Sequence, residues 1–244
     1  MPPKSKKTKK EMNTILNWYE IIPSSFKTEY SNPSYENCYL KHPFRMLIVA
    51  QSGGGKTTVA TDIIYRLQNT FAKIVLCIKN ADEPLYNYLR SKIKPENVEV
   101  YENGTIPPVS AYKDFEGQVL IIFDDLVNEG RKTQDAIKEY YIRGRKGCKN
   151  NAGISMMYLT QSYYAVPKTI RIQCNYIILK KLNSTKDLVM IMKDFSLGLE
   201  KEELIELYKY CTEDFTSFLL VDIDVPPEQR FRQGYFNVIN IPPS

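Results

Sequence analysis

The chain has 244 residues, of which 43% are hydrophobic and 25% charged, as is ordinary for a globular protein. Its formal net charge of +5 comes from the first ten residues, MPPKSKKTKK, because the remaining 28 basic and 28 acidic residues balance. One histidine and five scattered cysteines, without a C-x-x-C pair, argue against a zinc site, a serine–histidine triad and a disulfide scaffold.

The apolar runs, such as residues 119–123, are far shorter than a membrane-crossing segment. No apolar stretch follows the basic start as it would in a secretory signal. Cys77 and Cys174 lie in apolar runs typical of reduced core cysteines. We therefore expect a soluble intracellular protein without a membrane span.

Composition divides the chain into three parts. Residues 1–13 are lysine-rich without an apolar period, which predicts a disordered basic tail. The tail is a solvated extension, a non-specific nucleic-acid contact or a nuclear-localisation signal, and the sequence leaves these alternatives open. Residues 14–42 mix aromatic side chains with turn formers and predict an N-terminal arm packed on the core. Residues 43–244 form the predicted main domain.

In that domain, apolar runs typical of strands alternate with helical patterns. The expected strands are 44–50, 73–78, 98–101, 118–123, 154–159, 176–179, 215–221 and 231–239. The expected helices are 56–70, 82–93 with Asp82 as N-cap, 133–143, one opened by a Ser184–Asp187 capping box, and 199–211. This alternation predicts an α/β fold with a mostly parallel sheet, helices on both faces, and ligands at the carboxyl ends of the strands.

A glycine-rich run follows the first of these strands. The run AQSGGGKT, residues 50–57, matches the phosphate-loop pattern [AG]-x4-G-K-[ST], with alanine rather than glycine at its first position. Its glycines let backbone amides approach phosphate oxygens, the following helix adds its positive end, Lys56 supplies a charge and the Thr57 hydroxyl coordinates Mg²⁺. The predicted ATP-binding residues are Ser52, Gly53, Gly54, Gly55, Lys56, Thr57 and Thr58.

Two carboxylates end the most apolar strand. Asp124 is expected to hold the Mg²⁺ shell, and Asp125 to orient or deprotonate the attacking water. A kinase must exclude water, so the second acid favours hydrolysis. The alternative for Asp125 is a cap for the next turn.

Further polar residues follow later elements. Gln161 comes after the strand expected at 154–159 and suits a sensor of the γ-phosphate, because its amide both donates and accepts; the alternative is a polar strand end without a role. Arg143 and Arg145 end a helix and are candidates for an arginine that completes a neighbouring subunit's site. They alternatively complement the helix dipole or contact DNA phosphates. Arg171 is a third arginine of interest.

Five segments occur in an order that resembles one family. They are HPFRMLIVAQSGGGKT, IIFDD, RGRK, YLTQS and PKTIRIQCN, between residues 42 and 175. Together they are similar to the genome-packaging ATPases of the FtsK–HerA class, found in poxviruses, other large DNA viruses and virophages. The resemblance implies a RecA-like P-loop NTPase that uses ATP and Mg²⁺ to drive double-stranded DNA into a capsid.

The resemblance also implies partners, a location and residue roles. It implies a homo-oligomeric ring, a hexamer or pentamer, acting with capsid or portal-vertex proteins in the host cytoplasm or viral factory, or with the virion. It implies phosphate contacts at the glycine loop and catalytic roles for Lys56, Asp124, Asp125 and Gln161. It makes Arg143 or Arg145 the intersubunit candidate. No role follows for residues 184–244.

Other P-loop classes are weaker alternatives. A nucleotide kinase or an AAA-type helicase loader remains the runner-up, although the carboxylate pair argues against the kinase and the strand-like end against the loader. A GTPase lacks its N-K-x-D, and a transporter ATPase lacks its L-S-G-G-Q. A non-catalytic scaffold would not need intact catalytic residues.

Overall fold

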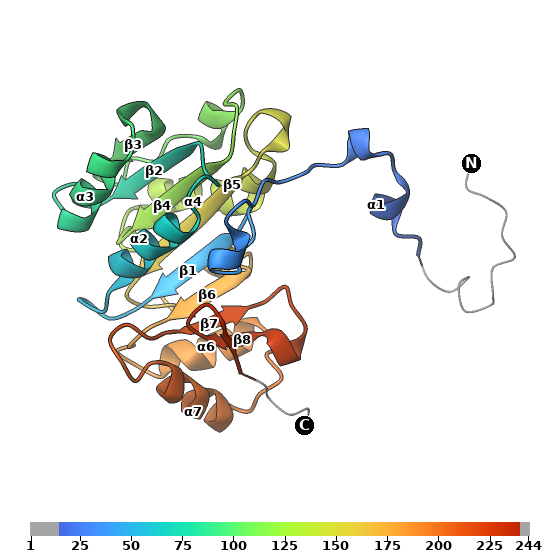
Figure 1. Ribbon diagram of the computed structural model, residues 1–244. Coiled ribbons are helices and arrows are strands. Elements are labelled where there is room, and N and C mark those ends of the chain that lie inside the picture. Colours follow the sequence, from blue (N-terminus) through green and yellow to red (C-terminus); the bar gives the residue numbers. More distant parts are fainter. Residues whose placement is uncertain (1–14, 240–244) are drawn as a thin grey trace, which may run out of the picture.

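One mixed sheet organises residues 15–239, the part of the chain that the computed structural model describes (Figure 1). Its strands are β1 (Arg45–Val49), β2 (Lys73–Ile78), β3 (Val98–Tyr101), β4 (Val119–Asp124), β5 (Ile154–Thr160), β6 (Tyr176–Leu179), β7 (Leu219–Asp222), β8 (Phe231–Gln233) and β9 (Asn237–Val238). They lie in the order β3-β2-β4-β5-β1-β6-β7-β8-β9. Strands β1 to β6 pair in parallel, and β7 to β9 extend the sheet antiparallel.

Helices cover both faces of this sheet (Figure 1). The α-helices are α1 (Trp18–Ile21), α2 (Lys56–Arg66), α3 (Pro84–Lys92), α4 (Arg131–Arg143), α5 (Lys168–Arg171), α6 (Lys186–Asp194) and α7 (Lys201–Cys211). The short 3-10 turns are η2 (Ser24–Phe26), η3 (Tyr35–Asn37), η4 (Pro95–Asn97), η5 (Val109–Tyr112), η6 (Gly144–Lys146), η7 (Lys149–Asn151) and η8 (Pro227–Gln229). No helix within residues 15–239 combines the length and the apolar character needed to reach across a bilayer.

The alternation of side chains along β4 builds two cores. Ile121 and Phe123 point to the face that α4, α6 and α7 cover, while Leu120 and Ile122 point to the face under α2 and α3. All four are fully buried. Each aliphatic side chain buried in this way contributes about 1.5–3 kcal/mol, so the continuous apolar run of β4 is the middle of the fold.

The predicted fold class, a mostly parallel α/β sheet with helices on both faces, is confirmed. Several local predictions are wrong. The strand expected at 215–221 begins only at Leu219, and Phe215 lies in a turn. Helix α3 begins at Pro84 with Glu83 as its N-cap rather than Asp82. The expected last strand divides into β8 and β9, because Gly234 turns the chain with a φ of 66°.

The predicted capping box at Ser184 and Asp187 is also wrong. Thr185 is the N-cap of α6 and makes no side-chain cap, although the Ser184 hydroxyl accepts a hydrogen bond from the Lys186 amide. The Asp187 carboxylate instead accepts hydrogen bonds from the loop that follows β5. The Asp187 side chain therefore makes tertiary hydrogen bonds instead of the helix cap that the local pattern predicts.

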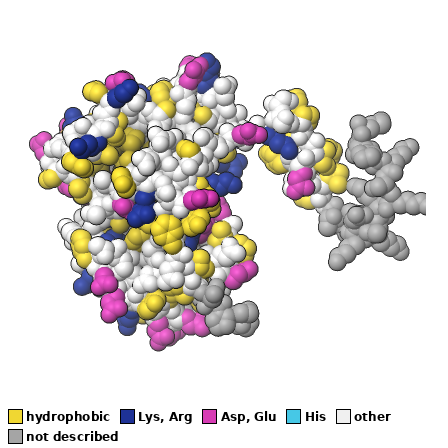
Figure 2. Space-filling model, in the orientation of Figure 1, with side chains coloured by type: hydrophobic (Ala, Val, Ile, Leu, Met, Phe, Trp, Pro, Cys, Tyr) yellow, Lys and Arg dark blue, Asp and Glu magenta, His cyan; other side chains and the backbone are white. Residues whose placement is uncertain are grey.

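The N-terminal arm has two different halves. Residues 30–42 are tied to the domain: Ser31 exchanges two hydrogen bonds with the Gln118 side chain, and buried His42 contacts Ser155 and the Ala152 carbonyl. Burial lowers the pKa of His42 to about 4. Residues 15–26 extend from the domain and leave apolar side chains exposed, among them Trp18, Tyr19 and Phe26 (Figures 1 and 2).

A buried ion pair joins the antiparallel strands β7 and β8. The Arg232 guanidinium lies 2.6 Å from the Asp222 carboxylate, and both side chains are buried. We expect Arg232→Met to lower the free energy of unfolding by about 3–5 kcal/mol, because it leaves a buried carboxylate without a counter-charge. Urea unfolding followed by circular dichroism measures the change. The double variant with Asp222→Asn should recover part of the loss, and a single-variant loss below about 1 kcal/mol contradicts the prediction.

Candidate nucleotide-binding site

Four neighbouring parallel strands end at the same edge of the sheet. The register pairs Val49 of β1 with Thr160 of β5 and Leu179 of β6, and it pairs Asp124 of β4 with Leu159. The segments that follow these strands therefore start at one level. This edge carries the glycine loop, the two carboxylates and Gln161, which are spread over residues 50–161 of the sequence.

The glycine loop connects β1 to α2. Gly53 and Gly55 have φ angles of 67° and 82°, a region that strains residues with a Cβ. Gly54 is required for space, because a Cβ there would lie 2.9 Å from the Gln51 carbonyl oxygen and 3.0 Å from the Ala50 Cβ. Buried Ala50 thus packs its methyl group where the loop folds back on itself.

The amino end of α2 faces this loop. Gly55 is the N-cap and supplies no side-chain acceptor, so the first amides of the helix remain free to bind an anion. The Lys56 ammonium curls over the loop and lies 3.3 Å from the Ala50 carbonyl and 3.4 Å from that of Gln51. Among the predicted ligands, Ser52 and Thr58 are exposed at the surface.

Asp124 is partly buried and contacts helix α3. The Tyr86 hydroxyl of α3 donates a hydrogen bond of 2.7 Å to its Oδ2 atom. Burial raises the pKa of Asp124, while the Tyr86 bond and the Lys56 charge oppose that rise. Asp124 therefore keeps its proton to a higher pH in the folded protein than in the unfolded chain. This tighter proton binding adds to the free energy of unfolding at low pH, and the added stability is lost as the pH rises through the folded pKa.

Asp125 and Gln161 meet across β4 and β5. The Gln161 side-chain amide lies 3.5 Å from the Asp125 Oδ1 atom. Asp125 has a φ of 56°, and its amide donates to the Leu159 carbonyl at 3.2 Å. A left-handed backbone at a residue with a side chain is costly and is typical of functional sites. Helix α4 has Gly130 as its N-cap, so Asp125 does not cap it.

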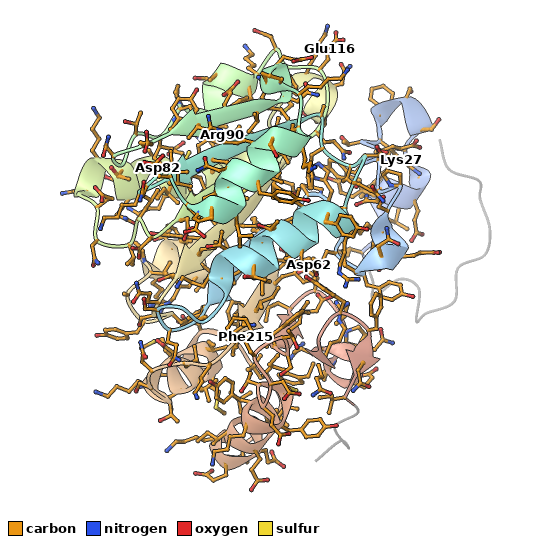
Figure 3. The ribbon with its side chains drawn as sticks, turned by 60° about the vertical axis from the view of Figure 1, so that its left-hand side comes forward. Lys27, Asp62, Asp82, Arg90, Glu116 and Phe215 are labelled. Carbon is orange, nitrogen blue, oxygen red and sulfur yellow. The ribbon has the colours of Figure 1, made fainter. Side chains whose placement is uncertain are left out.

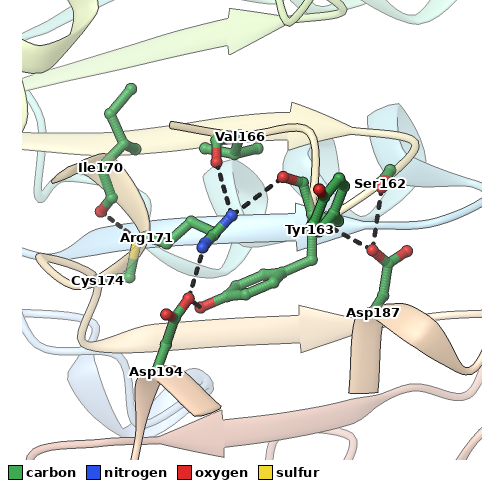
Figure 4. A network of polar contacts seen from close by, with 9 residues as sticks. Ser162, Tyr163, Val166, Ile170, Arg171, Cys174, Asp187 and Asp194 are labelled. Carbon is green, nitrogen blue, oxygen red and sulfur yellow. Dashed lines mark hydrogen bonds and ion pairs between the residues drawn. The ribbon is translucent and has the colours of Figure 1, made fainter. Parts of the chain in front are cut away.

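A polar network holds the loop that carries Gln161 (Figure 4). The Asp187 carboxylate accepts hydrogen bonds from the Ser162 hydroxyl and the Tyr164 amide. Arg171 is buried, lies 2.7 Å from the Asp194 carboxylate, and donates to the Tyr164 and Val166 carbonyls. Arg171 thus serves its own chain as an anchor for this loop.

Arg143 and Arg145 lie away from the glycine loop of their own chain. Arg143 is exposed and pairs with Glu139 one turn earlier, at 3.1 Å. Arg145 belongs to η6, which packs against the start of β5, at the opposite edge of the sheet from the carboxylates. Neither arginine therefore joins the cluster within one chain.

The poxvirus A32 protein family model matches residues 34–221, which is most of the chain. The chain belongs to this family. The predicted family resemblance is thereby confirmed, and the match includes the glycine loop, both carboxylates and Gln161. No curated protein sequence matches the chain.

Solved structures share the fold. The genome-packaging NTPase B204 of Sulfolobus turreted icosahedral virus 2, in complex with ATP-gammaS, matches with a TM-score of 0.57 and 16% identity, over 82% of this chain and 100% of that one. The DNA-packaging ATPase B204 of Sulfolobus turreted icosahedral virus matches with a TM-score of 0.54 and 17% identity, over 84% and 98% of the two chains. The cytoplasmic domain of the Thermomonospora curvata type VII secretion ATPase EccC matches with a TM-score of 0.51 and 13% identity, over 82% and 25%.

Tyr86 is a site residue that the sequence reasoning missed. It lies in the helix predicted at 82–93, where a tyrosine on an apolar stripe is typical of core packing. Its ring is indeed buried, but its hydroxyl ends on the Asp124 carboxylate. No local pattern predicts this contact, since the two residues are far apart in the sequence.

We expect Tyr86→Phe to raise the pKa of Asp124 further, because the variant removes a hydrogen bond that favours the ionised carboxylate. Carboxyl-carbon NMR titration of the nucleotide-free protein measures this pKa. Tyr112→Phe is the matched control, since the Tyr112 hydroxyl donates to Glu99 instead. An unchanged or lower Asp124 pKa in Tyr86→Phe contradicts the assigned role of the bond.

Proposed function

We propose that this protein is a viral genome-packaging ATPase that couples ATP hydrolysis to translocation of double-stranded DNA. The observation that carries the proposal is the meeting of the glycine loop, Asp124 and the Asp125–Gln161 pair at one sheet edge. Membership of the poxvirus A32 family and the shared fold with the B204 packaging ATPases support it.

The chain's own residues divide the work. Backbone amides of Gly53–Thr58 bind the phosphates, and Lys56 balances their charge. The Asp125 carboxylate accepts a proton from the attacking water, and Gln161 orients that water through its amide. The 3.5 Å contact between these two side chains supports this assignment, because one water molecule could contact both of them.

The oxygen cluster at Thr57 fits magnesium. The Tyr86 hydroxyl donates to the Asp124 carboxylate, and the Thr57 side chain lies close enough to the same hydroxyl to lower its pKa, so the two oxygens are near each other. Hydroxyl and carboxylate oxygens are the ligands that Mg²⁺ prefers in nucleotide sites. Bound magnesium supplies charge that offsets the charge on the phosphate oxygens. Thr57 and Asp124 are therefore the proposed metal ligands.

The partners follow from the same function. We expect a homo-oligomeric ring, a hexamer or pentamer, that acts on double-stranded DNA together with capsid or portal-vertex proteins in the host cytoplasm or viral factory. The exposed apolar side chains of residues 15–26 support a protein contact, because such patches are typical of interfaces. The first thirteen residues, whose DNA contact is one alternative, lie outside the described residues.

ATP hydrolysis with and without double-stranded DNA tests this function. We expect hydrolysis that rises with DNA, falls with salt because phosphate contacts are screened, and vanishes in Lys56→Ala. Hydrolysis by the wild type that DNA leaves unchanged, measured on assembled oligomers, contradicts the translocase. ATP hydrolysis that persists in Lys56→Ala contradicts the assigned site.

We expect Asp125→Asn to lower kcat by about 10²–10⁴-fold, because an amide cannot accept the proton of the attacking water. ATP affinity should stay within about threefold of the wild type, since Asp125 does not bind the phosphates. Steady-state kinetics and equilibrium ATP binding measure the two effects. Asp135→Asn is the matched control, since that carboxylate pairs with Lys138 on the surface of α4. A kcat within about threefold of the wild type removes Asp125 from the mechanism.

A mixing experiment tests the arginine role. If Arg143 or Arg145 completes a neighbour's site, a double alanine variant is inactive alone but regains hydrolysis when mixed with Lys56→Ala subunits. The Lys56→Ala subunit supplies the arginine, and the arginine variant supplies the intact glycine loop. An arginine finger contributes about 10³–10⁵ in rate, so recovery is readily measured. Wild-type hydrolysis by the double arginine variant alone refutes the role.

A further inference from the structure

Phe215 is an exposed aromatic residue beside the glycine loop, in a part of the chain that no motif covers. Its side chain is 65% exposed. A Cβ placed on Gly55 would lie 3.4 Å from the Phe215 ring, so the ring borders the amino end of α2. Figure 3 shows Phe215 between that end of α2 and the C-terminal elements.

Lys180 supports the ring from within the protein. It follows β6, is almost completely buried, and its amide donates to the Val49 carbonyl at 3.0 Å. Its ammonium donates to the Phe215 carbonyl and lies 4.9 Å from the centroid of the ring. The cation thus lies over the ring, while 65% of the side chain remains exposed and accessible to a ligand.

The turn that carries Phe215 is fixed on both sides. The Ser217 hydroxyl accepts a hydrogen bond from the Asp214 amide at 3.0 Å and donates one to the Asp214 carbonyl at 2.8 Å. Phe218, three residues on, is buried in the core. The chain therefore holds an aromatic ring in solvent at a defined place, although burying it would be favourable by about 1.5–3 kcal/mol in general.

We infer that Phe215 stacks on the base of the bound nucleoside triphosphate and that Lys180 is the residue that positions its ring. The inference rests on the proposed function, because the glycine loop must hold the phosphates for the base to reach this ring. Stacking uses the π-face that every base carries, so the site accepts nucleoside triphosphates without selecting one base by hydrogen bonds.

Equilibrium binding with two ligands tests the inference. ATP carries the base and tripolyphosphate lacks it. We expect Phe215→Ala to weaken ATP binding by about 5- to 150-fold, the range that loss of one stacked base gives, and to leave tripolyphosphate binding unchanged. Phe215→Ala should weaken GTP binding as much as ATP binding. Tyr210→Ala removes another exposed aromatic ring, from the end of α7, and should leave the binding of both ligands unchanged.

A spectroscopic variant gives an independent readout. Trp18 is the only tryptophan in the chain, so Trp18→Phe combined with Phe215→Trp places a single indole at the proposed site. A stacked base quenches indole fluorescence. We expect ATP to quench this variant at saturation and tripolyphosphate to leave its fluorescence unchanged.

The role of Lys180 has its own readout. Lys180→Met should weaken ATP binding, and adding Phe215→Ala should weaken it little more, because both changes remove the same stack. In the indole variant, Lys180→Met should reduce the quenching by ATP, and Lys180→Arg should retain it. Additive losses, or equal losses for ATP and tripolyphosphate, would mean that Lys180 acts on the glycine loop instead and would overturn its positioning role.

Three results separate the possible failures. A wild type that binds neither ATP nor tripolyphosphate would overturn the proposed function and the base site with it. A wild type that binds ATP, with Phe215→Ala binding it equally well, would overturn the base site alone. Equal losses of affinity for ATP and tripolyphosphate in Phe215→Ala would also overturn it, because the ring would then act on the glycine loop rather than on the base.

Discussion

The parallel register of β4, β5, β1 and β6 is the constraint on which the site depends. Parallel pairing brings the carboxyl ends of these strands to one level, with Val49 opposite Thr160 and Asp124 opposite Leu159. Because β5 lies between β1 and β4, Gln161 emerges between the glycine loop and the carboxylates. A shift of one residue in this register would turn the inward side chains outward and separate the groups.

The site accepts local costs that the surrounding core offsets. Asp124 is a carboxylate in a largely buried place with a raised pKa, and Asp125 holds a left-handed backbone. The adjacent lysine, Lys180, is buried and its pKa is lowered by desolvation. A left-handed backbone at a residue such as Asp125 costs of order 1–3 kcal/mol and persists only where packing over-determines it. Fully buried strands on both sides of β4 provide that packing.

The C-terminal half is part of the site rather than an appendage. Two carboxylates of α6 hold the loop after β5. Asp187 accepts hydrogen bonds from this loop directly, and Asp194 pairs with Arg171, which in turn donates to the loop. The turn before β7 carries Phe215 to the glycine loop. These contacts join residues 184–222 to the nucleotide-binding core.

The sequence by itself determined the fold class, the glycine loop, the carboxylate pair and most strand positions. These follow from local rules: apolar runs set strands, and AQSGGGKT needs only its neighbours to be recognised. The tertiary structure alone decided which distant side chains meet. Tyr86 contacts Asp124, and Asp187 accepts a hydrogen bond from Ser162 instead of capping its own helix. The Phe215 ring borders Gly55. Packing sets these contacts, because no local spacing relates the residues that make them.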